Sequence, residues 1–153
     1  MKKNYDPRMH SAEHILNQTM DRFFDCGRCV TSHIEKKKSK CDYRFSRPLS
    51  RGEIERVEKQ VNSIIQADLP VAERHLPQDE AARRFNLQKL PETAVDSIRI
   101  VAIGDYDACP CIGSHVRSTK EIGSFHITST DYDDGVLRIR FKLTRSDSKA
   151  LTD

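Results

Sequence analysis

The sequence lacks a long apolar run, because its longest uninterrupted aliphatic stretch covers only residues 100–103. A membrane-spanning helix needs about 20 consecutive apolar residues, so we expect no bilayer-spanning helix and no membrane partner. The first ten residues contain no apolar stretch behind Lys2 and Lys3, which argues against a secretory signal peptide. We therefore expect a protein of the cytoplasm.

Glycine and proline are also scarce, with six of each among 153 residues, which excludes collagen-like and low-complexity classes. This length suits one domain over residues 1–153, with a core of about residues 6–145 between two tails. The net charge is only +3, which neither establishes nor excludes a nucleic-acid partner. Five cysteines without a secretory signal favour thiols or metal ligands over a disulfide framework.

The hydrophobic pattern alternates between helical and strand periodicity. Asp6 and Pro7 are typical of a helix start, and apolar residues then recur at helical spacing over residues 7–25. Ser50 and Glu53 form a capping-box sequence before a second amphipathic helix that ends ahead of residue 70. Strand patterns cover residues 30–34, 42–45, 71–75, 98–103, 122–128 and 136–143, and a short helix is expected over residues 78–85. This pattern predicts an α+β fold, a two-layer domain whose mainly antiparallel sheet is packed by amphipathic helices.

His10 and His14 lie four residues apart on the first predicted helix, so their side chains share one face. The apolar stripe of that helix is centred near Ala12, Leu16 and Phe23, about 150° away from the two histidines. Two imidazoles at this spacing can bind one metal ion. Because an isolated pair of this kind is more often a solvated surface pair, a second ligand pair is required.

Cys111 and His115 supply that second pair, in a glycine-containing segment where irregular backbone can direct both side chains inward. Three imidazoles and one thiolate are a typical ligand set for Zn²⁺. We therefore predict one zinc ion bound by His10, His14, Cys111 and His115.

Other metal and redox motifs overlap these segments. The helical pair also matches His-x-x-Glu-His, a zinc-peptidase pattern with Glu13 as base, but that site needs a further carboxylate ligand. Cys26, Cys29, His33 and Cys41 could form a second, structural zinc site, but a strand would place Cys29 and His33 about 13 Å apart. The Cys-x-x-Cys at residues 26–29 follows a helix, whereas a redox pair of this type opens one, so structural thiols are favoured.

The order of the motifs adds information that their spacing does not. The motifs are His-Ser-Ala-Glu-His-Ile-Leu at residues 10–16, Asp-Tyr at 42–43, Glu58 with residues 61–65, residues 100–105, Cys-Ile-Gly-Ser-His-Val at 111–116 and Thr-Lys-Glu-Ile-Gly at 119–123. The chain resembles, from about residue 10 to residue 143, the editing domain shared by alanyl- and threonyl-tRNA synthetases and free-standing AlaX-type proteins. It is similar to the free-standing form, because the catalytic synthetase domains are missing. Family members often have Gly-Gly-Thr-His where this chain has Ile-Gly-Ser-His at 112–115, a departure that spares the ligands and concerns substrate choice.

The resemblance implies hydrolysis, in trans, of the ester that joins a wrong amino acid to a tRNA acceptor end. Seryl-tRNA(Ala) is the expected substrate, with glycyl-tRNA(Ala) or seryl-tRNA(Thr) next. The predicted zinc ligands would be the catalytic residues, and Thr31, His33, Gly113 and Ser114 are the expected substrate-binding residues. The zinc could activate a water, grip the substrate or be structural, and the sequence does not choose among these roles. A non-catalytic zinc module that binds tRNA or a synthetase is the alternative function, and a peptidase is the third.

Two basic segments are candidates for contacts with acceptor-stem phosphates. One is the lysine-rich run at residues 36–40, and the other is the face formed by Arg138, Arg140 and Lys142. Each is, by itself, also typical of solvated surface. The sequence leaves the oligomeric state open, and a monomer is compatible with it.

Overall fold

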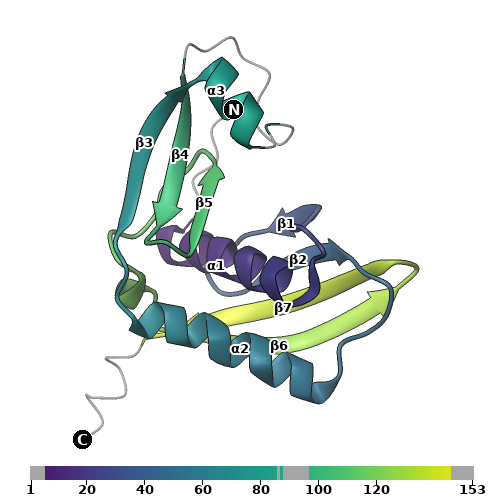
Figure 1. Cartoon of the computed structure of the whole chain (residues 1–153). Helices are drawn as coiled ribbons and strands as arrows, with labels where there is room; N and C mark the ends of the chain where they lie inside the picture. Colours follow the sequence, from purple (N-terminus) through teal and green to yellow (C-terminus); the bar gives the residue numbers. More distant parts are fainter. Residues whose placement is uncertain (1–5, 86, 88–96, 146–153) are drawn as a thin grey trace, which may run out of the picture.

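The computed structural model describes residues 6–85, 87 and 97–145 (Figure 1). Helix α1 (Pro7–Phe24) lies between β5 and a four-stranded sheet, and α2 (Arg51–Gln66) packs beside it. The two tails expected at residues 1–5 and 146–153 lie outside the described residues. Within the described part of the chain, no helix is long and apolar enough to cross a membrane.

The first sheet is antiparallel, with strand order β1-β2-β7-β6. Its strands are β1 (Thr31–His33), β2 (Ser39–Arg44), β6 (Ser124–Asp133) and β7 (Val136–Thr144). The β6–β7 hairpin turns at Asp134 and Gly135, whose φ angles of 48° and 83° are those that a two-residue turn of type I′ requires.

The second sheet is also antiparallel, in the order β3-β4-β5, and comprises β3 (Val71–Pro77), β4 (Ser97–Ile103) and β5 (Asp107–Pro110). Helix α3 (Gln78–Arg84) follows β3, and the short 3-10 helix η1 (Thr119–Ile122) precedes β6. The predicted α+β class with antiparallel strands and two amphipathic helices is confirmed. Period-two patterns do not specify which strands pair, so the sequence did not show that the strands divide between two sheets, and the short β5 was missed.

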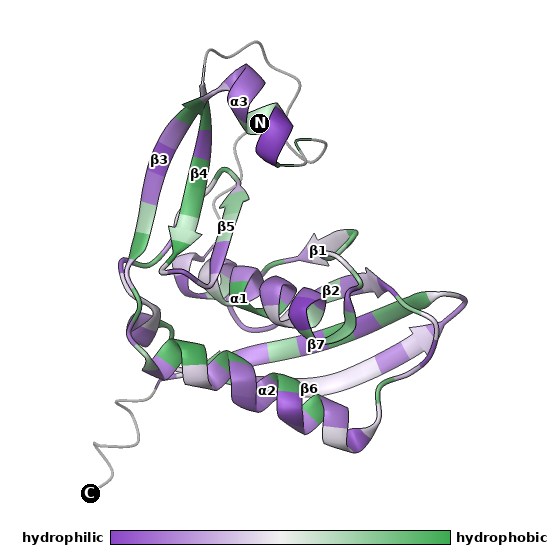
Figure 2. Cartoon of the chain, in the orientation of Figure 1, coloured by the Kyte–Doolittle hydropathy of each residue, from purple (hydrophilic) through white to green (hydrophobic). Residues whose placement is uncertain are grey.

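The main hydrophobic core lies between α1, α2 and the first sheet. Ser50 and Glu53 cap α2 reciprocally, as the capping-box sequence predicts, and Val57, Val61 and Ile65 are its buried face. Figure 2 shows that hydrophobic and hydrophilic residues alternate along α2, whereas β4 is mostly hydrophobic. A smaller cluster of Leu76, Ala81, Ile98 and Ile100 holds α3 to the second sheet.

Helix α1 is covered on more than its apolar stripe. Ala12 and Leu16 are fully buried in the main core, and His10, His14 and Asn17 are each only 3% exposed. β5 and the segment after it cover the side of α1 that carries His10 and His14, whereas Asn17 contacts Cys29 and Tyr43. The face that carries the two histidines is therefore an internal junction between the two sheets.

Candidate metal centre

The four predicted metal ligands converge on one point. His10 and His14 come from successive turns of α1, while Cys111 and His115 come from the segment that follows β5. One ligand atom from each of the four residues lies within 4.8 Å of all the others. The rings of His10 and His115 stack with centroids 4.0 Å apart, and His14 meets both edge-on.

Two of the imidazoles are oriented by contacts with the opposite segment. His10 Nδ1 lies 3.0 Å from the carbonyl oxygen of Ser114, and His115 Nδ1 lies 2.9 Å from Ser11 Oγ. The backbone N–H of Val116 also donates to Ser11 Oγ, at 3.2 Å. These contacts leave the Nε2 atoms available, and His115 Nε2 lies 3.2 Å from the Cys111 sulfur. An imidazole whose other nitrogen is held by a carbonyl or hydroxyl is the usual arrangement of a metal ligand.

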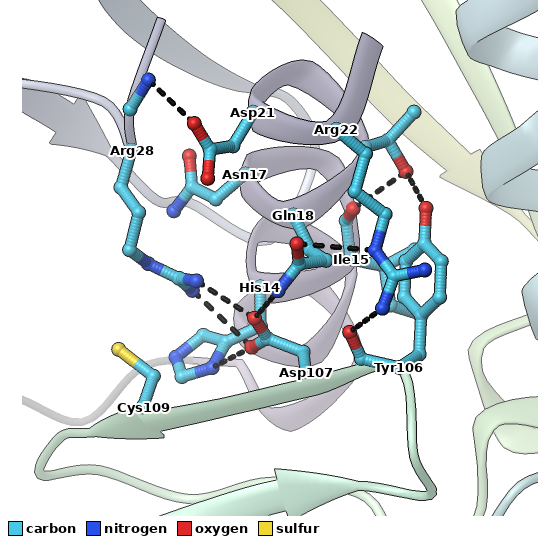
Figure 3. Close-up of polar contacts among 12 residues, drawn as sticks. His14, Ile15, Asn17, Gln18, Asp21, Arg22, Arg28, Tyr106, Asp107 and Cys109 are labelled. Atoms are coloured by element: carbon cyan, nitrogen blue, oxygen red, sulfur yellow. Dashed lines mark hydrogen bonds and ion pairs between the residues drawn. The ribbon is translucent and has the colours of Figure 1, made fainter. Parts of the chain in front are cut away.

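The third imidazole faces a buried carboxylate (Figure 3). His14 Nδ1 lies 3.5 Å from Asp107 Oδ2. Among the described residues, it is the buried side-chain nitrogen or oxygen that has no hydrogen-bond partner. Asp107 in turn accepts from Gln18 Nε2 at 2.8 Å and from Arg28 at 2.7 and 3.3 Å. Burial opposes ionisation of Asp107, but its contacts with His14 and Arg28 prevail and lower the carboxyl pKa. A carboxylate behind an imidazole is a common outer partner of a bound metal.

The β4–β5 turn is fixed to α1, which brings the two ligand pairs together. Tyr106 OH lies 2.7 Å from Thr19 Oγ1. The Arg22 guanidinium lies 4.2 Å from the centre of the Tyr106 ring and donates a hydrogen bond to the backbone carbonyl oxygen of Tyr106 (Figure 3). On β4, Arg99 donates to the carbonyl oxygens of Cys111 and Gly113. Both ends of the Cys111-containing segment are thus held by side chains of neighbouring elements.

Burial sets the charge state of the ligands. Desolvation, aided by the neighbouring His14, lowers the pKa of His10 to about 4 and that of His115 to about 2. Both imidazoles are therefore neutral near pH 7, with a lone pair available for a cation. Desolvation raises the pKa of the Cys111 thiol to about 12, and a bound cation would reverse that effect by stabilising the thiolate. Three imidazoles and one thiol around a common point fit Zn²⁺.

The predicted substrate-binding residues fall into two groups. Gly113, with a φ of 105°, and Ser114 belong to the metal centre, where Ser114 supplies the carbonyl oxygen that His10 contacts. Thr31 and His33 lie on the exposed edge strand β1. Their side chains contact Asp42, at 3.2 Å, and Glu35, at 3.5 Å, rather than the cluster.

The cysteines and the glutamate of the alternative metal and redox motifs have other partners than those motifs require. Cys29 and Cys41 do lie together, but their third neighbour is Glu13 and not His33. The Glu13 carboxylate, which would be the base of the zinc-peptidase pattern, accepts from the Cys29 thiol at 3.5 Å. Cys26 bonds to backbone carbonyls at the end of α1.

The predicted basic face of β7 is largely paired. Arg138 donates to both oxygens of Asp42 at 2.8 and 3.0 Å, and Arg140 pairs with Asp131. The charges of these arginines are therefore offset by acids on adjacent strands. By contrast, residues 36–38 form an exposed turn between β1 and β2.

Sequence reasoning missed the residues that orient the ligands. Ser11 lies inside the histidine motif, but nothing in the spacing shows that its hydroxyl bonds His115. The other orienting residues, Asp107, Arg28 and Arg99, are distant along the chain from their partners. The separation reaches 93 residues between His14 and Asp107. An isolated polar residue at the start of a strand would have been the sole signal for Asp107.

Comparison with known proteins relates this centre to tRNA synthetases. A family model described as the threonyl and alanyl tRNA synthetase second additional domain matches residues 98–152, which include Cys111 and His115. The matched residues resemble that domain. They contain Cys111 and His115, half of the predicted ligand set, whereas α1, which carries the other half, lies outside the match.

Relatives extend the similarity beyond that domain. The alanine–tRNA ligase of Cenarchaeum symbiosum is 34% identical over 140 residues, which cover 88% of this chain and 15% of the ligase. The alanyl-tRNA editing protein AlaX-L of Pyrococcus horikoshii is 36% identical over 120 residues, which cover 76% of this chain and 28% of that protein. The alanine–tRNA ligase of Methanopyrus kandleri is 32% identical over 138 residues, with 88% and 15% covered. The chain therefore spans less than a third of the length of each of these relatives.

Proposed function

We propose that this chain is an aminoacyl-tRNA deacylase that removes a wrong amino acid from a tRNA acceptor end in trans. The observation that carries the proposal is the convergence of three oriented imidazoles and one thiol in a homologue of an alanyl-tRNA editing protein. Seryl-tRNA(Ala) is the first candidate substrate, followed by glycyl-tRNA(Ala) and seryl-tRNA(Thr). The proposed single domain over residues 1–153 and a cytoplasmic location agree with this role.

The centre contributes binding and orientation more than acid–base chemistry of its own. His10, His14, Cys111 and His115 would hold a zinc ion, which can polarise an ester carbonyl or lower the pKa of a water. An aminoacyl ester is already activated, so a site needs mainly to position the ester and the attacking water. The burial of His10 and His14 limits water around the ligands, and low pKa values keep His10 and His115 unprotonated.

The segment around Gly113 and Ser114 is the proposed contact for the aminoacyl group. Arg99 fixes the carbonyl oxygen of Gly113, and His10 fixes that of Ser114, so this backbone has a defined shape beside the ligands. Ile112, which replaces the more usual glycine, is 40% exposed and projects from the same segment. A bulky side chain here would restrict the size of the accepted amino acid.

Thr31 is the proposed sensor of a serine hydroxyl, and His33 on the same strand is its proposed companion. Thr31 has a hydroxyl that Asp42 orients by accepting from it. A Thr31→Val variant would keep the shape and lose the hydroxyl, so its preference for seryl over glycyl esters should decrease by about tenfold. Equal preference ratios for Thr31→Val and the unchanged protein would reject this role.

The proposal is tested by incubating the protein separately with seryl-, glycyl-, alanyl- and threonyl-tRNAs and following ester loss. We expect rapid loss of one mischarged species, sparing of the correctly charged ones, and no loss with His10→Ala or Cys111→Ala. His75→Ala is the matched control, because this histidine lies exposed on β3 and should retain full activity. Binding of tRNA with no ester loss for any species would instead support a non-catalytic module.

A further inference from the structure

A second group of side chains that could bind a metal ion lies beside α1. Glu13, Cys29 and Cys41 each offer one ligand atom, and these atoms lie within 4.8 Å of one another. They come from three elements: Glu13 from α1, Cys29 from the residues ahead of β1, and Cys41 from β2. Glu13 stands between His10 and His14 in sequence, but its carboxylate contacts the Cys29 thiol. The group is therefore distinct from the centre built by the four predicted ligands.

Burial and spacing both suit a metal ion. Cys29 is 2% exposed and Cys41 is fully buried, so both thiols are removed from solvent. Cys29 Sγ and Glu13 Oε2 are 3.5 Å apart. Tetrahedral zinc with Zn–S of about 2.3 Å and Zn–O of about 2.0–2.2 Å separates its sulfur and oxygen ligands by roughly 3.5 Å. Cys29 and Glu13 therefore already have the spacing that a shared cation would require.

The surroundings hold the backbone of this group in place. Asn17 Oδ1 accepts from the Cys29 backbone N–H at 3.2 Å and from Tyr43 OH at 2.7 Å. A contact with Cys29, together with burial, raises the pKa of the Cys41 thiol. Without a cation the Cys41 thiol therefore keeps its proton, and binding of a divalent ion would release that proton to solvent.

We propose that Glu13, Cys29 and Cys41 bind a second zinc ion, with one coordination position left to water, and that this ion has a structural role. It would join α1 to the β1–β2 hairpin. Because β1 has only three residues and all are exposed, few packing contacts of its own side chains hold it. A cross-link at Cys29 would fix the start of the strand that carries Thr31 and His33.

The test is a titration of the metal-stripped full-length chain with Co²⁺, followed by the absorption band that Co²⁺–thiolate bonds produce. We expect two equivalents to bind, one with a single thiolate and one with two thiolates. A His14→Ala/Cys111→Ser variant should retain the two-thiolate equivalent alone. Cys41→Ser should retain the single-thiolate equivalent alone, while Cys26→Ser, outside both groups, should retain both.

Glu13→Gln provides a second test that avoids altering the buried thiols. It should weaken the two-thiolate equivalent by at least about tenfold, because an amide oxygen is a poorer zinc ligand than a carboxylate. One equivalent in the unchanged protein, lost entirely in His14→Ala/Cys111→Ser, would overturn the proposal. A Cys29–Cys41 disulfide, shown by a mass lower by two hydrogens, would also overturn it. Neither result depends on ester hydrolysis, so the proposed function is tested separately.

Discussion

Two histidine–carboxylate pairs in this protein have the same separation and opposite surroundings. His14 Nδ1 and Asp107 Oδ2 lie 3.5 Å apart, with side chains 4% and 0% exposed. His33 Nε2 and Glu35 Oε2 also lie 3.5 Å apart, but their side chains are 67% and 62% exposed. Water screens the second pair, whereas the first pair belongs to a network that includes Arg28 and Gln18. Burial, and not distance, is what should make the first pair part of the metal centre and leave the second pair outside it.

The largest expected difference concerns metal binding and hydrolysis by His14→Ala and His33→Ala. His14→Ala should abolish zinc binding at the predicted centre and lower the hydrolysis rate by about a thousandfold, the equivalent of several kcal/mol of transition-state stabilisation. His33→Ala should retain the zinc and change the rate by less than about tenfold. Zinc analysis and single-turnover deacylation measure both effects. Equal losses in the two variants would contradict the contrast.

The next largest effect is on the free energy of unfolding, when the carboxylate of each of the two pairs is replaced by an amide. Asp107→Asn leaves the Arg28 guanidinium without its charged partner and should lower the free energy of unfolding by about 3 kcal/mol. Glu35→Gln should lower it by less than about 0.5 kcal/mol, because the exposed pair contributes little. Urea denaturation of both variants makes the comparison. Similar midpoints for the two variants would show that the buried network is not stabilising.

Acid should destabilise the metal-free protein through the buried rings. His10 and His115 have folded-state pKa values of about 4 and about 2, below the ordinary 6.5, so the unfolded chain binds more protons as pH falls below about 6.5. Stability present above that pH should fall by about 2 kcal/mol for each of the two rings between about pH 7 and about pH 5. Denaturation in the presence of a chelator measures this loss, and His10→Gln should reduce it. A constant free energy of unfolding across this range would contradict the assigned shifts.

The smallest expected effects are on tRNA affinity, and they compare basic side chains that are paired with an acid with lysines on the exposed turn. Replacing Lys36, Lys37 and Lys38 by alanine should weaken tRNA affinity and lower the salt slope by about 1 for each phosphate that is no longer neutralised. The double variant Arg138→Ala/Asp42→Ala removes a bonded pair without changing net charge, so affinity should stay within about twofold. Filter binding over a salt series measures both. If the Arg138→Ala/Asp42→Ala variant lost more affinity than the lysine variant, the β7 face would be the main tRNA-binding surface.

The helices and ligand pairs were predictable because their signals are local. The His-x3-His spacing and the apolar stripe of residues 7–25 located the histidines on one face, and α1 ends one residue short of the predicted end. The capping-box sequence located the start of α2. The strand at residues 122–128 was less well predicted, since β6 begins at Ser124 and extends to Asp133. Exposed and half-buried positions there obscure a period-two pattern.

The sequence by itself determined which side chains can bind a metal, because ligand chemistry and helical spacing are properties of nearby residues. The tertiary structure alone decided that the two strand sets form separate sheets and that α1 is buried between them. It also decided that Asp107 supports His14, that Glu13 joins two cysteines, and that Arg138 is paired. These facts depend on contacts between residues distant along the chain, and such contacts are set by packing, which has no signature within a short stretch of sequence.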